Sequence, residues 1–339
     1  MVSVSDKKAG ARILVIQTAS AGDVILATPV IEKIHDERPD TAIDFLLKKG
    51  NESLFEGHPF INEVIVWNKN ASKYRNLPGI IRRVRSAKYD QVINLQRFFS
   101  TGLITALSGA KIRVGFDKNP FSWTYHVRKR HSIGESSLHE TERNLSLIGH
   151  HTQNGRAPVK LYPTRNHFAS VARFKKEPYI CIAPASLWFT KQYPVEKWIE
   201  FIRELKGDHS IYLLGSGNDY DICKYITDRT KGKHIEIVAG SLTFLETAAL
   251  MKDAEMNFVN DSAPLHLASA MDAPVTAIFC STVPAFGFGP LSSDAAVVET
   301  EIDLECRPCG LHGYPECPLS HFKCAFTIDK NKLIKRIEN

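Results

Sequence analysis

The spacing of apolar residues predicts short buried strands that alternate with helices. Residues 13–16 (ILVI) form a continuous apolar run followed by turn residues, which is typical of a strand buried on both faces of a parallel sheet. Further strands are expected in the first half at residues 42–47, 64–67, 91–95 and 112–115. Helical periodicity lies between several of them, at residues 78–87 and 101–107. Another helix should begin at Gly22-Asp23, with a kink where Pro29 interrupts the run.

The same alternation restarts after a polar, proline-containing stretch at residues 149–166. Strands are expected at residues 179–183, 211–214, 235–238, 254–260 and 275–279. Helices should separate them at residues 195–205, 219–230, 244–252 and just after Asn260. This pattern predicts an α/β chain of two doubly wound, Rossmann-like domains, residues 1–165 and 166–339. Ligands would lie at the carboxyl ends of the strands and in a central cleft between the domains.

Length and composition agree with two globular domains. The chain has 339 residues, more than one ordinary hydrophobic core holds, and its apolar fraction of 43% and charged fraction of 24% are ordinary for soluble proteins. The start, MVSVSDKKAGA, has lysines but no apolar signal region, so we expect a cytoplasmic protein. The net charge is +6, with basic clusters at residues 82–85 and 128–130. These clusters are either solvated faces or contacts for an anionic partner or membrane surface, and no nucleic-acid partner is expected.

Residues 259–271 (VNDSAPLHLASAM) carry the first candidate site. They read as the end of a strand, a turn and a helix, with Asp261 and Ser262 as helix N-cap residues and Pro264 in the first turn. Such a helix start binds anions, and a carboxylate and the His266 imidazole stand beside it, so a nucleotide diphosphate is a natural ligand. The alternative is that Asp261 only caps the helix and His266 is a satisfied helix-face histidine.

The second candidate site is the loop ASAGDV, residues 19–24, directly after the first strand. Open α/β sheets hold ligands at this position, so Asp23 would face the cleft. The alternative is that Asp23 is the N-cap of the next helix. Gly22 belongs to no Gly-x-Gly-x-x-Gly motif, which gives little support to a nicotinamide dinucleotide site.

Several stretches together resemble one family, the ADP-heptose:lipopolysaccharide heptosyltransferases, which have the two-domain GT-B architecture. They are ILVIQTASAGDVILATPVI, INLQRFFSTGLITALSGAKIRVGF, HETERNLSLIG, IAPASLWFTKQYPVEKWIEFI, YLLGSGND and VNDSAPLHLASAMDAPVTAIF. The resemblance covers nearly the whole chain. It implies metal-independent, inverting transfer of a heptose from ADP-heptose to a lipopolysaccharide inner-core acceptor. It further implies a lipid-linked oligosaccharide acceptor, which would place the protein in the cytoplasm or peripherally at the inner membrane.

The resemblance also implies roles for single residues. Asp23 corresponds to the catalytic base, and Ser20, Ala21 and Gly22 form the acceptor-side loop around it. The donor-binding residues would be Thr190, Lys191, Asp219, Asp261, Ser262, Ala263, Leu265 and His266. Among them, Lys191 would meet the diphosphate and Asp219 the ribose. The chain departs from the family at two positions, with Asp219 where Glu is common and Ala263 where Gly is usual.

Four of the seven cysteines crowd into the segment 306–324. Cys306, Cys309, Cys317 and Cys324 have a spacing that a structural zinc ion could use, with His312 and His321 as further ligands. Four reduced cysteines packed in a loop are the favoured alternative, and a disulfide is the third, which a reducing cytoplasm disfavours. No cofactor is expected to be required for transfer.

Two other functions compete with glycosyl transfer. A sugar-nucleotide epimerase can have the same two-domain fold, but it needs several cleft carboxylates and a histidine for elimination and re-addition. A non-catalytic nucleotide- or glycan-binding module would have lost the base. The presence of Asp23 at its motif position counts against the binding module.

Overall fold

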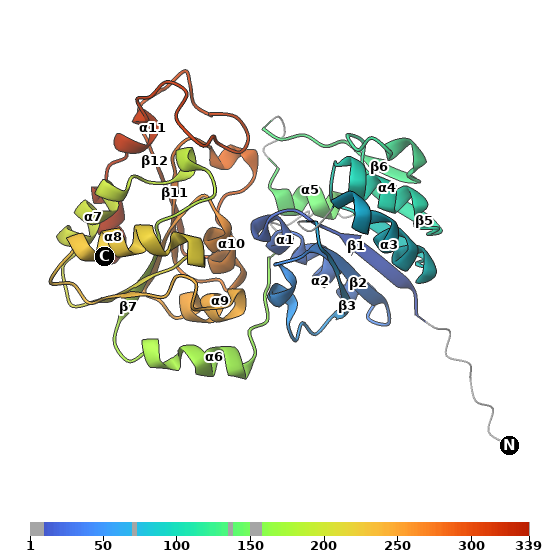
Figure 1. Cartoon of the computed structure of the whole chain (residues 1–339), viewed down its shortest axis with the longest axis horizontal. Coiled ribbons are helices and arrows are strands. Elements are labelled where there is room, and N and C mark those ends of the chain that lie inside the picture. Colours follow the sequence, from blue (N-terminus) through green and yellow to red (C-terminus); the bar gives the residue numbers. More distant parts are fainter. Residues whose placement is uncertain (1–9, 70–72, 135–137, 150–157, 339) are drawn as a thin grey trace. The chain divides into compact units, whose positions relative to one another are not determined.

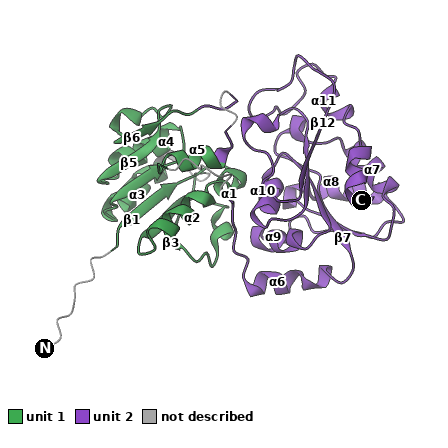
Figure 2. Cartoon of the chain, turned by 180° about the vertical axis from the view of Figure 1, so that it is seen from behind, with its two compact units in different colours: residues 1–131, 141–155 green, residues 132–140, 156–339 purple. Residues whose placement is uncertain are grey.

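The computed structural model describes residues 10–69, 73–134, 138–149 and 158–338. The N-terminal segment in which no signal was expected lies mostly outside these ranges, as do residues 150–157 of the predicted polar stretch. The chain divides into two compact units (Figure 2). Unit 1 comprises residues 1–131 and 141–155, and unit 2 comprises residues 132–140 and 156–339. The domain boundary expected between residues 165 and 166 stays a prediction.

Unit 1 is built on a six-stranded parallel sheet (Figure 1). The strand order is β3-β2-β1-β4-β5-β6. Its strands are β1 Arg12–Ile16, β2 Ala42–Lys48, β3 Ile61–Trp67, β4 Gln91–Asn94, β5 Ile112–Phe116 and β6 Val127–Lys129. Strand β1 is buried along almost its whole length, as its apolar run predicts. The order turns back between β1 and β4, which makes the carboxyl ends of these two strands the place where such a sheet binds ligands.

The helices of unit 1 follow the predicted alternation, with two differences. They are α1 Ala21–Ile25, α2 Thr28–Glu37, α3 Lys73–Ser86, α4 Phe99–Leu107 and α5 Glu140–Ser146, with short 3-10 turns η1 Glu52–Phe55 and η2 Ser122–Thr124. The expected kink at Pro29 is a complete break, because α1 ends at Ile25 and Pro29 lies in the first turn of α2. Proline is suited to that position because it lacks an N–H group. Helix α3 begins five residues before Pro78, which it accommodates inside the helix.

Unit 2 repeats this architecture. Its strands are β7 Tyr179–Ala183, β8 Ser210–Leu213, β9 Ile235–Ile237, β10 Met256–Asn260, β11 Val275–Phe279 and β12 Ala295–Glu299. They form a second parallel sheet with the order β12-β11-β10-β7-β8-β9. The first and fourth strands of the unit, β7 and β10, are again neighbours, so the switch point has the same place in both sheets. The predicted α/β fold class of two doubly wound units is therefore confirmed.

The helices of unit 2 cover a core to which the C-terminal helix also contributes. They are α6 Arg165–Val171, α7 Val195–Glu204, α8 Tyr220–Arg229, α9 Phe244–Lys252, α10 Ala263–Ala270, α11 Lys323–Phe326 and α12 Asn331–Glu338. Short 3-10 turns are η3 Ala172–Phe174, η4 Phe189–Lys191, η5 Gly217–Asp219 and η6 Pro284–Phe286. Trp198 and Phe201 of α7 pack with Phe258 of β10 in one apolar cluster, which Leu333 of α12 also joins. No helix in the described ranges is long and apolar enough to span a membrane.

Candidate functional site

Two of the residues predicted to bind the donor, Lys191 and Asp261, meet at the switch point of the unit 2 sheet. The segment that follows β7 ends in η4 with Lys191, and Asp261 directly follows β10. The Lys191 Nζ lies 2.6 Å from the Asp261 Oδ2, and the side chains are only 16% and 7% exposed. These residues are far apart along the chain, and the fold joins them as a mostly buried ion pair.

Asp261 has a second partner that the sequence did not reveal. Thr282 lies three residues after the end of β11. Its hydroxyl donates a 2.6 Å hydrogen bond to the Asp261 Oδ2. The N-cap of α10 is Ser262, so the alternative in which Asp261 only caps this helix is wrong. The Asp261 carboxylate is instead held between a cation and a hydroxyl, which fixes its orientation beside the helix start.

Asn260 fastens the two loops of the switch point together. Its Oδ1 accepts a hydrogen bond from the Tyr193 N–H at 2.9 Å, and its Nδ2 donates to the Pro184 carbonyl oxygen at 2.9 Å. The side chain is fully buried. A buried amide whose donor and acceptor are both used makes a stiff connection, so the segment carrying Lys191 is held against the end of β10.

The start of α10 is open to a ligand. The Ser262 side chain makes no capping hydrogen bond, and Ser262 and Ala263 are half-buried. The N–H groups of a helix's first turn have no acceptor within the helix, and the helix dipole favours an anion there. Leu265 differs from the other predicted residues of this group, because its side chain is fully buried in the core. It can act on a ligand only through the backbone of the helix that it anchors.

His266 lies on α10 with its imidazole buried. Burial lowers the pKa of His266 to about 3, and the positive charges of His139 and Lys191 act in the same direction. The ring is therefore neutral at physiological pH. Among the described residues none hydrogen-bonds to its Nδ1, so the alternative of a satisfied helix-face histidine fails for this atom. An unpaired polar atom in a buried position beside the Lys191–Asp261 pair indicates a place for a ligand group.

Thr190 has a structural position. Its hydroxyl oxygen accepts hydrogen bonds from the Tyr314 N–H at 2.7 Å and from the Ser281 hydroxyl at 3.1 Å. Gly313 packs so closely here that an added Cβ would lie 2.9 Å from the Thr190 Oγ1 and 3.0 Å from the Lys191 Cγ. Thr190 therefore joins the cysteine-rich segment to the backbone next to Lys191. Its hydroxyl already has hydrogen-bond partners within the protein.

Asp219 lies after β8, one strand away from β7. Its Oδ2 accepts hydrogen bonds from the Ser216 N–H at 2.7 Å and from the Ser216 hydroxyl at 2.8 Å. This arrangement is a capping box for η5, and Asp219 is itself the N-cap of α8. Both of these bonds use one carboxylate oxygen.

Asp23 lies in unit 1, in α1, which follows the first strand β1. Its Oδ2 accepts hydrogen bonds from the Ser20 hydroxyl and from the Ser20 N–H, the latter at 3.2 Å. The alternative that Asp23 is the N-cap of this helix is only partly right. Ser20 is the N-cap, and Asp23 is the third helical residue, whose side chain binds back to Ser20 in a capping box. Ala21 is half-buried and Gly22 is buried in the first turn of α1. No described residue hydrogen-bonds to the Asp23 Oδ1, and Asp23 is partly exposed.

A polar group that the sequence analysis missed lies at the same edge of this sheet. The Thr18 hydroxyl donates a 2.6 Å hydrogen bond to the Gln96 Oε1, and the Lys69 Nζ lies 2.6 Å from the Thr18 Oγ1. Each of these residues follows a strand, namely β1, β4 and β3. Their strand-end positions were the only available signal. The group supplies a cation and hydroxyl-binding atoms at the sheet edge that also carries Asp23.

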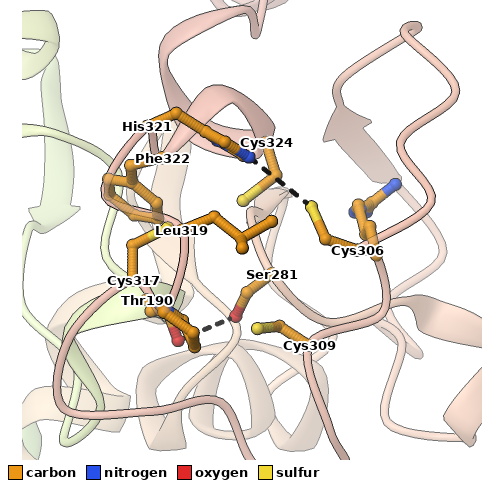
Figure 3. Close-up of a pocket in the computed structure, with 11 residues that line it drawn as sticks. Thr190, Ser281, Cys306, Cys309, Cys317, Leu319, His321, Phe322 and Cys324 are labelled. Atoms are coloured by element: carbon orange, nitrogen blue, oxygen red, sulfur yellow. Dashed lines mark hydrogen bonds between the residues drawn. The ribbon is translucent and has the colours of Figure 1, made fainter.

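The four clustered cysteines surround a small cavity of unit 2 (Figure 3). The Cys306 Sγ lies 3.9 Å from the His321 Nε2, whereas His312 does not line the cavity. Arg307 fixes the segment to the end of β11 by donating to the Cys280 carbonyl oxygen at 2.7 Å. Burial raises the pKa of Cys324 to about 11, so this cysteine is a neutral thiol.

The structure does not form the zinc arrangement that the cysteine spacing suggested. Within the described ranges, no three His, Cys, Asp or Glu side chains are arranged to hold a metal ion. All seven cysteines are free, so the disulfide alternative is not formed either. The donor atoms are suited to a soft metal, but their arrangement is not.

Two Rossmann-like units with the same strand order make up the GT-B architecture. A lysine, a carboxylate and an open helix start lie at the switch point of one of these units. Glycosyltransferase family 9 (heptosyltransferase) matches residues 79–315, and the chain belongs to this family. It is 27% identical over 285 residues to lipopolysaccharide heptosyltransferase 3 from Escherichia coli, covering 77% of this chain and 81% of that protein. The family match supports the transferase and not the epimerase alternative.

Solved structures agree on the fold. The structure of the E. coli ADP-heptose lipopolysaccharide heptosyltransferase II matches with a TM-score of 0.78 and 20% identity over 96% of this chain and 97% of that one. The iron-containing dodecameric glycosyltransferase TibC from enterotoxigenic E. coli matches with a TM-score of 0.60 and 16% identity, over 98% of this chain and 76% of that one.

Proposed function

We propose that this heptosyltransferase-family enzyme transfers heptose from ADP-heptose to the inner core of a lipopolysaccharide precursor, with inversion at the anomeric carbon. The observation that carries the proposal is the Lys191–Asp261 pair beside the open start of α10, at the switch point of unit 2. The E. coli protein whose structure matches this chain is named for ADP-heptose, which supports this donor. We also propose a cytoplasmic enzyme that meets its lipid-linked acceptor at the inner membrane surface.

Unit 2 would bind the donor through its charge. The ADP leaving group develops negative charge as the glycosidic bond breaks, and a lysine together with a helix N-terminus stabilises that charge. The Lys191 ammonium is already close to the α10 start, because Asp261 holds it at 2.6 Å. The Asp261 carboxylate would then accept hydrogen bonds from sugar hydroxyls, and the neutral His266 imidazole would accept a hydrogen bond from a sugar hydroxyl or donate one to it.

Asp23 would act as the general base. Its Oδ1, which no described residue binds, takes the proton of the acceptor hydroxyl while that oxygen attacks the anomeric carbon. The bond from the anomeric carbon to the diphosphate oxygen breaks, and ADP leaves with the electron pair. One carboxylate is sufficient for this direct displacement. Ser20 keeps Asp23 oriented by holding the other oxygen.

The proposed reaction uses no metal ion. Lys191 and the helix start supply the charge stabilisation that a divalent cation supplies in other transferases. Exhaustive chelation of the purified protein should therefore leave transfer unchanged. A loss of transfer that is restored by one added metal would contradict this part of the proposal, and it would direct attention to the cysteine cavity.

Product analysis tests the function as a whole. The purified enzyme is incubated with a panel of nucleotide sugars and with lipopolysaccharide acceptors truncated at successive inner-core positions, and the products are identified by mass spectrometry. We expect one heptose to be added from ADP-heptose to one of these acceptors. Transfer from a different nucleotide sugar would overturn the donor assignment, and epimerised free nucleotide sugar would overturn the reaction type.

A further inference from the structure

Unit 1 exposes a group of aromatic and basic side chains that the proposed reaction does not use. The aromatic members are Phe98 and Phe99 at the start of α4 and Trp123 in η2, which are 57%, 55% and 74% exposed. Lys118, Arg128 and Arg130, all outside the buried core, lie in the same stretches that follow or form β5 and β6. We call these six residues the aromatic-basic patch. Large apolar side chains that lie together on a surface indicate an interaction site, and Phe99 contacts Phe121, two residues before Trp123.

The patch is carried by a rigid part of the fold. Phe99 packs edge-to-face on Phe121, with ring centroids 5.1 Å apart, which joins α4 to the segment before Trp123. On the other side of Trp123, the Tyr125 hydroxyl accepts a 3.1 Å hydrogen bond from the buried Asn94 Nδ2. Trp123 therefore projects from a fixed turn, and its exposure is a property of the folded chain.

The charge of the patch is positive. Residues 117–130 contain four cationic side chains and one acidic side chain, Asp117. The Asp117 carboxylate is partly used within the fold, where its Oδ1 accepts a 3.0 Å hydrogen bond from the His131 N–H. Neither Lys118 nor Arg128 forms an ion pair with any residue in the described ranges. Both cations can therefore meet an anionic partner from outside the chain.

Much of the patch lies at the edge of the sheet that holds Asp23. Strands β1, β4 and β5 are parallel and adjacent, so their carboxyl ends share one edge. Asp23 follows β1, Phe98 follows β4 and Lys118 follows β5. A surface bound there would hold a lipid-linked acceptor beside the proposed base.

We propose that the aromatic-basic patch docks unit 1 onto an anionic lipid bilayer surface. Tryptophan and phenylalanine side chains settle at the headgroup level of a bilayer, and lysine and arginine are attracted by anionic headgroups. This combination of exposed aromatic and cationic side chains fits a lipid surface better than a folded protein partner. Cations are common around the aromatic members of the patch, and residues 117–130 contain only one acidic side chain. The benefit of docking rests on the proposed function, because a bilayer would present the lipid-linked acceptor. The docking itself needs neither the sugar donor nor the acceptor.

Vesicle co-sedimentation of the full chain tests the docking. The parent protein should bind extruded vesicles of phosphatidylethanolamine and phosphatidylglycerol, should bind phosphatidylcholine vesicles at least tenfold more weakly, and should be released by NaCl. Trp123→Ala should weaken binding to the anionic vesicles, and Lys118→Glu/Arg128→Glu should weaken it by about fivefold for each cation replaced. In a Trp188→Phe background, the Trp123 emission should shift to the blue on binding, because Trp67 and Trp198 are fully buried.

The second basic cluster supplies the matched control. Arg82 and Arg85 on α3 are exposed, and Arg82→Glu/Arg85→Glu makes the same change in net charge without touching the patch. Equal loss of binding in this control would overturn the inference, as would absence of vesicle binding by the parent or an unshifted Trp123 emission. Stronger release by inorganic phosphate than by NaCl of equal ionic strength would also overturn it, because the patch would then be a phosphate site. Transfer to a delipidated, water-soluble acceptor tests the proposed function separately.

Discussion

Replacing Lys191 by methionine should separate its structural role from its role in donor binding. The Lys191 ammonium is 2.6 Å from the Asp261 carboxylate, and the two side chains are 16% and 7% exposed. Breaking a fully buried pair by removing one partner costs about 3–5 kcal/mol. Because Lys191 keeps some contact with solvent and Thr282 still binds Asp261, we expect a smaller fall in the free energy of unfolding, about 2–3 kcal/mol. ADP affinity should fall by about 1.5–3 kcal/mol, the value of a charge-assisted contact to a phosphate.

The double variant Lys191→Met/Asp261→Asn makes the test decisive. Removing both charges leaves no unpaired buried ion, so most of the lost unfolding free energy should return, while ADP affinity should stay low. Urea denaturation measures the first quantity and isothermal titration calorimetry with ADP measures the second. If ADP affinity recovered together with stability, or if Lys191→Met bound ADP as the parent does, Lys191 would be a structural lysine and the donor assignment would be refuted.

Three further predictions concern the base, the buried histidine and the cysteine-rich segment. Asp23→Asn should reduce turnover by about 10²–10⁴-fold while the melting temperature stays within about 2 °C, because asparagine can still accept the Ser20 hydrogen bonds; near-parental turnover would leave Asp23 as a helix residue only. Burial lowers the pKa of His266 from 6.5 to about 3, so its contribution to stability should be complete above pH 6.5 and should decline below it by up to about 1.4 kcal/mol per pH unit. Thermal unfolding between pH 7 and pH 4 should therefore be flatter in His266→Gln, and an unchanged slope would contradict the burial argument. Gly313→Ala should lower both the melting temperature and ADP affinity, because its Cβ would lie 3.0 Å from the Lys191 Cγ, whereas Gly232→Ala, with a similar positive φ and open space, should change only stability.

The alternation of βα units could be predicted from the sequence because buried parallel strands leave continuous apolar runs. Strands β1, β7 and β11 are all of this kind. Strands β6 and β12, which lie at the edges of their sheets, were not predicted. The apolar run of β12, Ala-Ala-Val-Val-Glu, could have indicated a strand, whereas β6 reads only Val-Arg-Lys. Short, charged edge strands protect a sheet against further pairing and give little hydrophobic signal.

The candidate site was predicted less completely, for reasons of distance along the chain. Strand-end positions identified Asp23 and Asp261, and the family resemblance identified Lys191. No local pattern could show that Thr282 would bind Asp261 or that the Thr190 hydroxyl would be occupied by Tyr314, 124 residues away. The sequence also could not decide whether the cysteine spacing forms a metal site, since ligand geometry depends on how the whole segment packs against β11.

The shared strand order of the two sheets has a consequence for how this enzyme can be changed. Each sheet carries its own switch point, with the proposed base after β1 in one unit and the lysine–carboxylate pair after β7 and β10 in the other. Loops at one switch point can vary in length and residue type without disturbing the strands that hold the other. With the proposed assignment of the donor to unit 2 and the acceptor to unit 1, selectivity for the sugar nucleotide and selectivity for the receiving glycan can diverge independently. Grafting the strand-end loops of unit 1 from a relative is then a rational route to a new acceptor preference.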